Sequence, residues 1–204
     1  MTTLLLDCTH GSTKSGFAQA VRSLVPEPRE LLPILDYVPQ DAHAHDHHHH
    51  SIQEVHDAIQ AAPVAEAVKE DARGVYAVIA AAEAKAHGVS AREVHFHEVG
   101  APDAIAHIVA ACDALSRLSF DAIASTPVCT GFGFVDCAHG TLPIPAPATA
   151  HILEDIPAFA GDEEGELTTP TGAALAVHFA DRFASTAAEA QESSPELTLH
   201  CNPC

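Results

Sequence analysis

Histidine and acidic residues gather in two places along this 204-residue chain, and both could bind a metal ion. In the segment HFHE, His95 and His97 are two residues apart, so in a strand both imidazoles point to the same side, and Glu98 follows where the chain turns. Two imidazoles and a nearby carboxylate make a minimal site for a divalent ion. A half-exposed strand with histidines on its solvent face explains the pattern equally well.

The second place is a histidine-rich tract at residues 41–50. Imidazole suits nickel, zinc and copper, and nickel stands high in the affinity series of divalent ions. The tract has nothing to bury, so we expect a mobile loop that captures metal; catalysis needs ligands on rigid elements. A low-complexity insertion and a pH-dependent charge patch are the alternatives. Its candidate metal ligands are His43, His45, His47, His48, His49 and His50.

Three further segments carry residues suited to binding. The segment TTPTG, residues 168–172, offers hydroxyl and N–H groups at an expected helix start, which suits a phosphate or carboxylate; an ordinary N-cap is the alternative. Cys137 and His139 lie on one side of the chain if it is extended, although cysteine is commonly inert packing. The segment HCNPC contains Cys201 and Cys204, which make half of a zinc site at best.

Strand and helix patterns alternate along the chain without a repeat, which predicts a mixed α/β fold. Residues 3–8 predict a buried strand. We expect a single mixed α/β domain over residues 1–183, in which residues 41–50 form a disordered histidine-rich loop. A polar, flexible tail is expected over residues 184–204.

Local signals predict the ends of two helices between the tract and the HFHE segment. Ser51 and Glu54 have the spacing of a capping box, in which each side chain accepts a hydrogen bond from the other's backbone. The next helix is expected to open at Pro63, where a missing N–H does no harm, and to end at Gly88. Gly74 is expected to mark a break in it.

Charge and composition exclude several classes of function. The chain has 28 acidic and 9 basic residues, a formal net charge of −19, so nucleic acid is not an expected partner. No stretch approaches the roughly 20 apolar residues of a membrane helix, and no secretory signal is visible, so we expect the cytoplasm and reduced cysteines. An acidic, lysine-poor surface also suits a salt-rich cytoplasm, as in halophiles.

Three segments in order, VHFHEVGAPDAIAHIVAACDAL, CAHGTLPIPAPAT and GELTTPTGAAL, resemble the LarC family of nickel-insertion proteins. The strand LLLDC and the internal histidine tract add to the resemblance, which covers about Leu4 to Phe183. It implies a CTP-dependent cyclometallase of the lyase class. Such an enzyme inserts Ni(II) into pyridinium-3,5-bisthiocarboxylic acid mononucleotide, forming one carbon–nickel and two sulfur–nickel bonds of the nickel-pincer cofactor.

The chain departs from the family pattern in three respects. The loop THGSTKSG stands where the family usually has a SGISGDM-like loop, and His107 stands where the family often has aspartate. The family's C-terminal portion, associated with CTP binding, is missing. The chain is therefore expected to be an N-terminal half that works with a separately encoded C-terminal part, or a truncated product; homo-oligomerisation stays open.

The resulting hypothesis assigns a role to each candidate residue. His95, His97 and Glu98 hold nickel with His139 and Cys137 as assistants, and Glu98 is the first choice of general base. Thr169, Thr171 and Gly172 of TTPTG, together with the THGSTKSG loop, receive the phosphate or carboxylate of the substrate. One alternative is a nickel chaperone or storage protein without catalysis, in which the tract does the binding. The other alternative is a zinc-dependent hydrolase built on HFHE.

Overall fold

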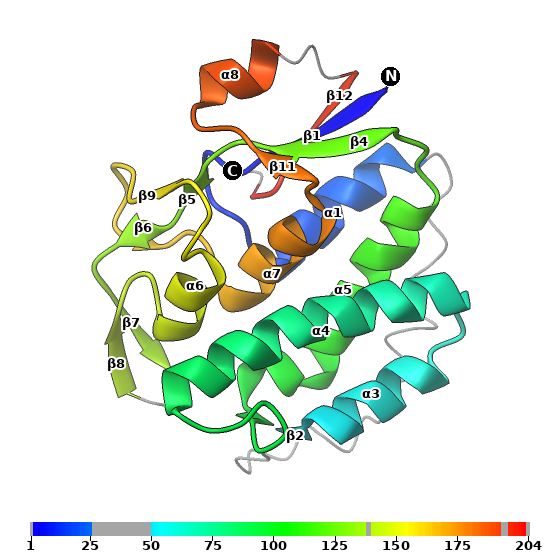
Figure 1. The fold of residues 1–204 in the computed structure, drawn as a ribbon, viewed down its shortest axis with the longest axis vertical. Helices are drawn as coiled ribbons and strands as arrows, with labels where there is room; N and C mark the ends of the chain where they lie inside the picture. The colour runs from blue at the N-terminus through cyan, green and yellow to red at the C-terminus, as the bar shows by residue number, and fades with distance from the viewer. Residues whose placement is uncertain (1, 26–49, 138–139, 193–195, 203–204) are drawn as a thin grey trace.

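A four-stranded parallel sheet lies towards one end of the molecule, and most of the helices lie on one side of it (Figure 1). The computed structural model describes residues 2–25, 50–137, 140–192 and 196–202. Strand order in the sheet is β11-β4-β1-β12, and each neighbouring pair is parallel. The strands are β1 (Thr3–Asp7), β4 (Ala122–Ser125), β11 (Arg182–Phe183) and β12 (Leu197–His200). The mixed α/β class predicted from the sequence is confirmed.

The predicted first strand is confirmed as β1, and its three leucines explain why it lies inside the sheet. Leu4, Leu5 and Leu6 are fully buried, as expected of a parallel strand covered on both faces. Leu4 and Leu6 join the main core, whereas Leu5 packs with Ala124 and with Ala190 of the short helix α8 (Ala187–Glu192). The chain therefore covers both faces of its sheet.

Among the described residues, six helices pack on the main-core side of the sheet and on one another (Figure 1). The long helix α4 packs against α5, α6 and α7, and α1 packs against α5. Many of the buried residues of α5 and α7 are alanines. The helices are α1 (Lys14–Leu24), α3 (Ile52–Ala61), α4 (Glu66–His87), α5 (Pro102–Ser116), α6 (Pro147–Ile152) and α7 (Pro170–Phe179).

Short paired strands carry the connections between these helices. The hairpin of β7 and β8 and the pair β2–β3 lie at the end of the molecule away from the main sheet (Figure 1). The 3₁₀ helix η2 (Glu98–Gly100) follows β3. The strands are β2 (His50–Ser51), β3 (His95–Phe96), β5 (Val128–Cys129), β6 (Gly131–Phe132), β7 (Phe134–Cys137), β8 (Gly140–Pro143), β9 (Ala158–Phe159) and β10 (Gly165–Glu166).

Of the four local signals for helix starts, ends and breaks, two are confirmed and two are wrong. Ser51 and Glu54 form the expected capping box of α3, and Gly88 ends α4 in the left-handed conformation, with φ 67°. The expected start at Pro63 is wrong, because α4 begins at Glu66. The expected break at Gly74 is also wrong: α4 is continuous, and a Cβ at Gly74 would lie 2.3 Å from the His178 ring.

The expectation of a flexible tail over residues 184–204 is wrong for most of that segment. Residues 187–192 form α8, and β12 pairs with β1 as an edge strand of the main sheet. Leu199 and Cys201 are buried. Tertiary pairing with a strand nearly 200 residues away overrides the polar composition of this segment. No helix within the described ranges is long and apolar enough to span a membrane.

Candidate nickel and mononucleotide site

A cavity of about 360 Å³ lies between α4, η2, the β7–β8 hairpin and the starts of α1, α6 and α7. Two motifs far apart in sequence meet there. His95, His97 and Glu98 line it from β3 and η2, and Thr169 and Thr171 line it from the start of α7. The structure thus brings together five of the residues predicted for the site. Its other polar lining residues are Lys14, Glu83, His87, Asp136, Cys137 and Glu166.

The HFHE segment reaches the cavity through a turn and not through a continuous strand. β3 ends at Phe96, and His97 leaves the extended conformation with φ −93° and ψ −99°. The buried Phe96 ring anchors the segment beside Tyr76, with ring centroids 5.9 Å apart. His95 stays exposed and His97 half-buried, so both imidazoles are accessible from the cavity.

A buried tyrosine fixes the backbone that follows these histidines. The Tyr76 hydroxyl donates a hydrogen bond of 2.8 Å to the carbonyl oxygen of Val99. Burial, with the nearby charge of Asp103 adding to it, raises the pKa of Tyr76 well above its usual value, so this hydroxyl remains a donor. The turn bearing Glu98 is thereby attached to the middle of α4.

A complete metal site is not preformed in the part of the chain that the structure describes. There, no three His, Cys, Asp or Glu side chains gather closely enough to hold a metal ion. His95, His97 and Glu98 share the cavity, but a metal bound by them needs side-chain rotation or further ligands. His139 and the tract residues His43, His45, His47, His48 and His49 lie outside the described residues.

The end of the histidine tract pairs as a β-strand with the HFHE segment. In the antiparallel pair β2–β3, His50 lies opposite Phe96 and Ser51 lies opposite His95. Gly100 permits this arrangement, because a Cβ there would lie 2.8 Å from the Cβ of His50. The tract therefore ends one strand away from the two cavity histidines.

The start of α7 provides the other wall of the cavity. Thr169 is the N-cap of α7, and its hydroxyl accepts a hydrogen bond of 3.3 Å from the N–H of Gly172. Ser12 crosses this helix start: its N–H donates to the hydroxyl of Thr168 at 2.9 Å, and its own hydroxyl donates to the carbonyl of Gly172 at 3.0 Å. Gly172 does not line the cavity, and its contacts are with this crossing loop.

Most of the chain matches the sequence model of a known family. A family model described as nickel insertion protein matches residues 5–194. The chain belongs to this nickel insertion family. No solved structure matches it.

Curated relatives in the family bear the name pyridinium-3,5-bisthiocarboxylic acid mononucleotide nickel insertion protein. The relative from Staphylococcus saprophyticus is 50% identical over 129 residues, which are 63% of this chain and 33% of the relative. The relative from Staphylococcus epidermidis is 37% identical over 201 residues, covering 88% of this chain and 51% of the relative. The chain therefore spans a third to a half of the length of the relatives it matches.

Two further residues line the cavity: Glu166, which the sequence analysis did not single out, and Lys14, which belongs to the THGSTKSG loop. Glu166 lies in β10 opposite Gly131; burial, with the negative charge of Glu98 adding to it, raises its pKa. Lys14 begins α1, and its Nζ lies 2.5 Å from a carboxylate oxygen of Asp103. Glu166 stands three residues before Thr169, so its place beside the predicted helix start was the available signal.

Proposed function

We propose that this chain receives Ni(II) and delivers it into pyridinium-3,5-bisthiocarboxylic acid mononucleotide, as the N-terminal part of a CTP-dependent cyclometallase of the lyase class. The observation that carries the proposal is the single cavity that His95 and His97 share with Thr169 and Thr171, one strand away from the end of a histidine tract. Family membership and the names of the relatives support the same substrate.

On the metal side of the cavity, nickel is a substrate to be handed over and not a resident cofactor. His95 and His97 offer neutral nitrogen ligands and Glu98 offers oxygen. The described side chains do not form a complete ligand set. In our proposal the two thiocarboxylate sulfur atoms of the substrate supply the missing ligands, so that nickel leaves the protein as these bonds form. The tract at residues 41–50 raises the local nickel concentration, as a tethered ligand does.

On the other side, the cavity offers groups for the phosphate of the mononucleotide. Thr169 and Thr171 stand in the first turn of α7, a ten-residue helix whose N-terminal N–H groups and dipole favour an anion. Lys14 adds a positive charge from the start of α1. We propose that these three residues orient the mononucleotide so that its pyridinium ring faces the histidines, with Gly172 supporting the helix start.

The chemical step needs a base in this cavity. As the carbon–nickel bond forms, the ring carbon loses its proton, and the electron pair of the C–H bond becomes the bond to nickel. Glu98 is the proposed proton acceptor, since its carboxylate lines the cavity beside the two histidines. CTP is the proposed co-substrate and binds a separately encoded C-terminal part; the proposed compartment is the cytoplasm.

Nickel incorporation into the mononucleotide, assayed with CTP and with and without the C-terminal part, tests this function. We expect the double variant His95→Ala/His97→Ala to lose about 100-fold or more of the insertion rate, because the ligands that present nickel are gone. The matched control His56→Ala/His151→Ala removes two histidines outside the cavity and should keep the rate. Insertion at the normal rate by the first variant would remove this pair from the mechanism.

A nickel chaperone without covalent chemistry is the second candidate, and the absence of a complete ligand set among the described residues favours it. Deletion of residues 41–49, which leaves His50 in β2, separates the two. A chaperone loses nickel binding and its whole effect with the tract. The insertion enzyme proposed above keeps its maximal rate and needs a higher nickel concentration to reach it.

A further inference from the structure

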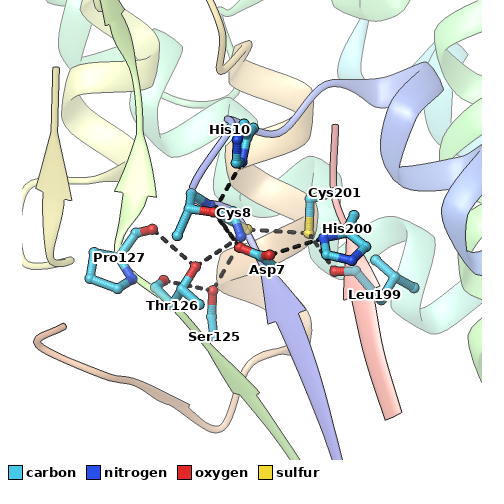
Figure 2. Close-up of polar contacts among 10 residues, drawn as sticks. Asp7, Cys8, His10, Ser125, Thr126, Pro127, Leu199, His200 and Cys201 are labelled. Atoms are coloured by element: carbon cyan, nitrogen blue, oxygen red, sulfur yellow. Dashed lines mark hydrogen bonds and ion pairs between the residues drawn. The ribbon is translucent and has the colours of Figure 1, made fainter. Parts of the chain in front are cut away.

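Two cysteine thiols meet where the first and last strands of the sheet end. Cys8 follows β1 and Cys201 follows β12, and their Sγ atoms lie 3.2 Å apart (Figure 2). Both residues are fully buried. This pair lies outside the cavity described above, and the proposed function does not use it.

The backbone around the pair has the spacing that a disulfide needs. β1 and β12 are parallel with Asp7 opposite His200, and the N–H of Cys201 donates to the carbonyl of Asp7 at 3.0 Å. Strands so paired lie about 4.8 Å apart, within the range of Cα separations that disulfides span. Small side-chain rotations therefore suffice to bring the sulfur atoms to bonding distance, without moving the strands.

We propose that Cys8 and Cys201 are a site of reversible covalent modification, at which a small-molecule disulfide oxidises the two thiols to one intramolecular disulfide. In the first step the thiolate of one cysteine attacks the reagent, forms a mixed disulfide and releases one reagent thiolate. The second cysteine then loses its proton and displaces the second reagent thiolate. Two protein thiols become one disulfide, and one reagent disulfide becomes two reagent thiols.

Burial of the two thiols in the intact sheet keeps the thiol–disulfide exchange slow. Burial, with the neighbouring thiol of Cys8 adding to it, raises the pKa of Cys201 well above the usual value for a thiol. In the part of the chain that the structure describes, β12 is an edge strand that pairs only with β1, so a reagent can reach the thiols when this edge opens. The exposed His200 imidazole lies 2.9 Å from the Asp7 carboxylate, so the strand must release this contact when it opens.

The disulfide would fix the base of the loop that crosses the cavity wall. The loop leaves β1 at Cys8 and reaches the start of α7 through Ser12. The segment after β12 also packs on α1, since a Cβ at Gly16 would lie 2.8 Å from the carbonyl oxygen of Cys201. Joining the two cysteines therefore ties the first strand, the last strand and this loop together.

The test uses the purified full chain in glutathione buffers of increasing oxidised fraction, at low and at mildly denaturing urea concentration. We expect the loss of two thiols, a tryptic peptide that links Cys8 to Cys201, and faster linkage in urea. The unfolding temperature should rise by about 10 °C over the reduced chain, because the bond closes almost the whole chain into one loop. Dithiothreitol should reverse both changes.

Two matched variants test whether the linked peptide and the temperature shift depend on Cys8. Cys8→Ser should remove the linked peptide and the temperature shift, whereas Cys112→Ser, at a buried thiol in α5, should keep both. If Cys8→Ser fails to fold, the peptide map of the unaltered chain still decides. Linkage of Cys201 to Cys204, stable glutathione adducts without a protein disulfide, or unchanged thiols at every urea concentration would overturn the proposal.

Discussion

Four of the residues that line the cavity carry carboxylates, and at the scale of single residues the effect of one of them, Glu98, on another, Glu166, is measurable. The pKa of Glu166 is raised by burial and by the charge of Glu98, so folding favours the protonated form of Glu166. The stability associated with this group is fully present below the ordinary carboxyl pKa and is lost as the pH rises through the raised value. Above the raised pKa, the ionised form of Glu166 is less favourable in the folded state than in the unfolded state.

We therefore predict that Glu166→Gln raises the unfolding temperature by roughly 2 °C at pH 7, an effect limited by the partial exposure of the group. This gain should shrink as the pH falls to about 4, because Glu166 becomes protonated there and then carries no charge, like the glutamine of the variant. Thermal unfolding in metal-free buffer from pH 4 to pH 8 measures it. The exposed Glu164→Gln on the same loop is the control and should show no such trend; a pH-independent gain would contradict the explanation.

At the scale of elements, the start of α7 and the loop after β1 depend on a glycine. A Cβ at Gly172 would lie 1.9 Å from the carbonyl oxygen of Ser12, which is backbone and cannot turn away. Gly172→Ala should therefore lower the free energy of unfolding by about 3 kcal/mol, measured by urea denaturation. In the control Gly74→Ala the new methyl meets the movable ring of His178, and alanine favours helix, so the change should stay within about 1 kcal/mol. Equal losses in the two variants would contradict this reasoning.

Elements with local signals could be predicted from the sequence, and elements that depend on distant partners could not. Three leucines in a row were enough to predict β1, and the Ser51–Glu54 capping box lies within one turn of helix. By contrast, β12 is a strand because it pairs with β1. The sequence near Leu199 contains no local signal that predicts this pairing.

The candidate site divides in the same way. The type and spacing of His95, His97, Thr169 and Thr171 made them candidates, and the family resemblance favoured them over the structural alternatives. All four line the cavity. The proximity of Glu166 to Glu98 could not be foreseen, because it depends on how the fold brings β10 and η2 to the same cavity. A strand was expected to carry both histidines, and the turn at His97 replaces it because Phe96 and Tyr76 bury the chain there.

At the scale of the whole molecule, the acidic residues far outnumber the basic residues that could pair with them. All three lysines of the chain lie beside carboxylates: Lys14 beside Asp103, Lys69 beside Glu66, and Lys85 beside Glu154. Among the arginines, Arg73 and Arg117 also contact carboxylates. With 28 acidic and 9 basic residues, the formal net charge is −19, and the repulsion among the excess carboxylates opposes the compact state.

Salt should therefore stabilise the folded chain. Raising KCl from about 0.01 M to 1 M shortens the screening length from about 30 Å to 3 Å, which removes most of the repulsion between surface carboxylates. We predict that the unfolding temperature, followed by circular dichroism, rises by about 10 °C or more at pH 7, and that the rise is smaller at pH 5, where part of the carboxylates are protonated. Sucrose, which stabilises by exclusion without screening, should lack this pH dependence. An unfolding temperature that does not change with KCl would show that the charge excess does not limit stability.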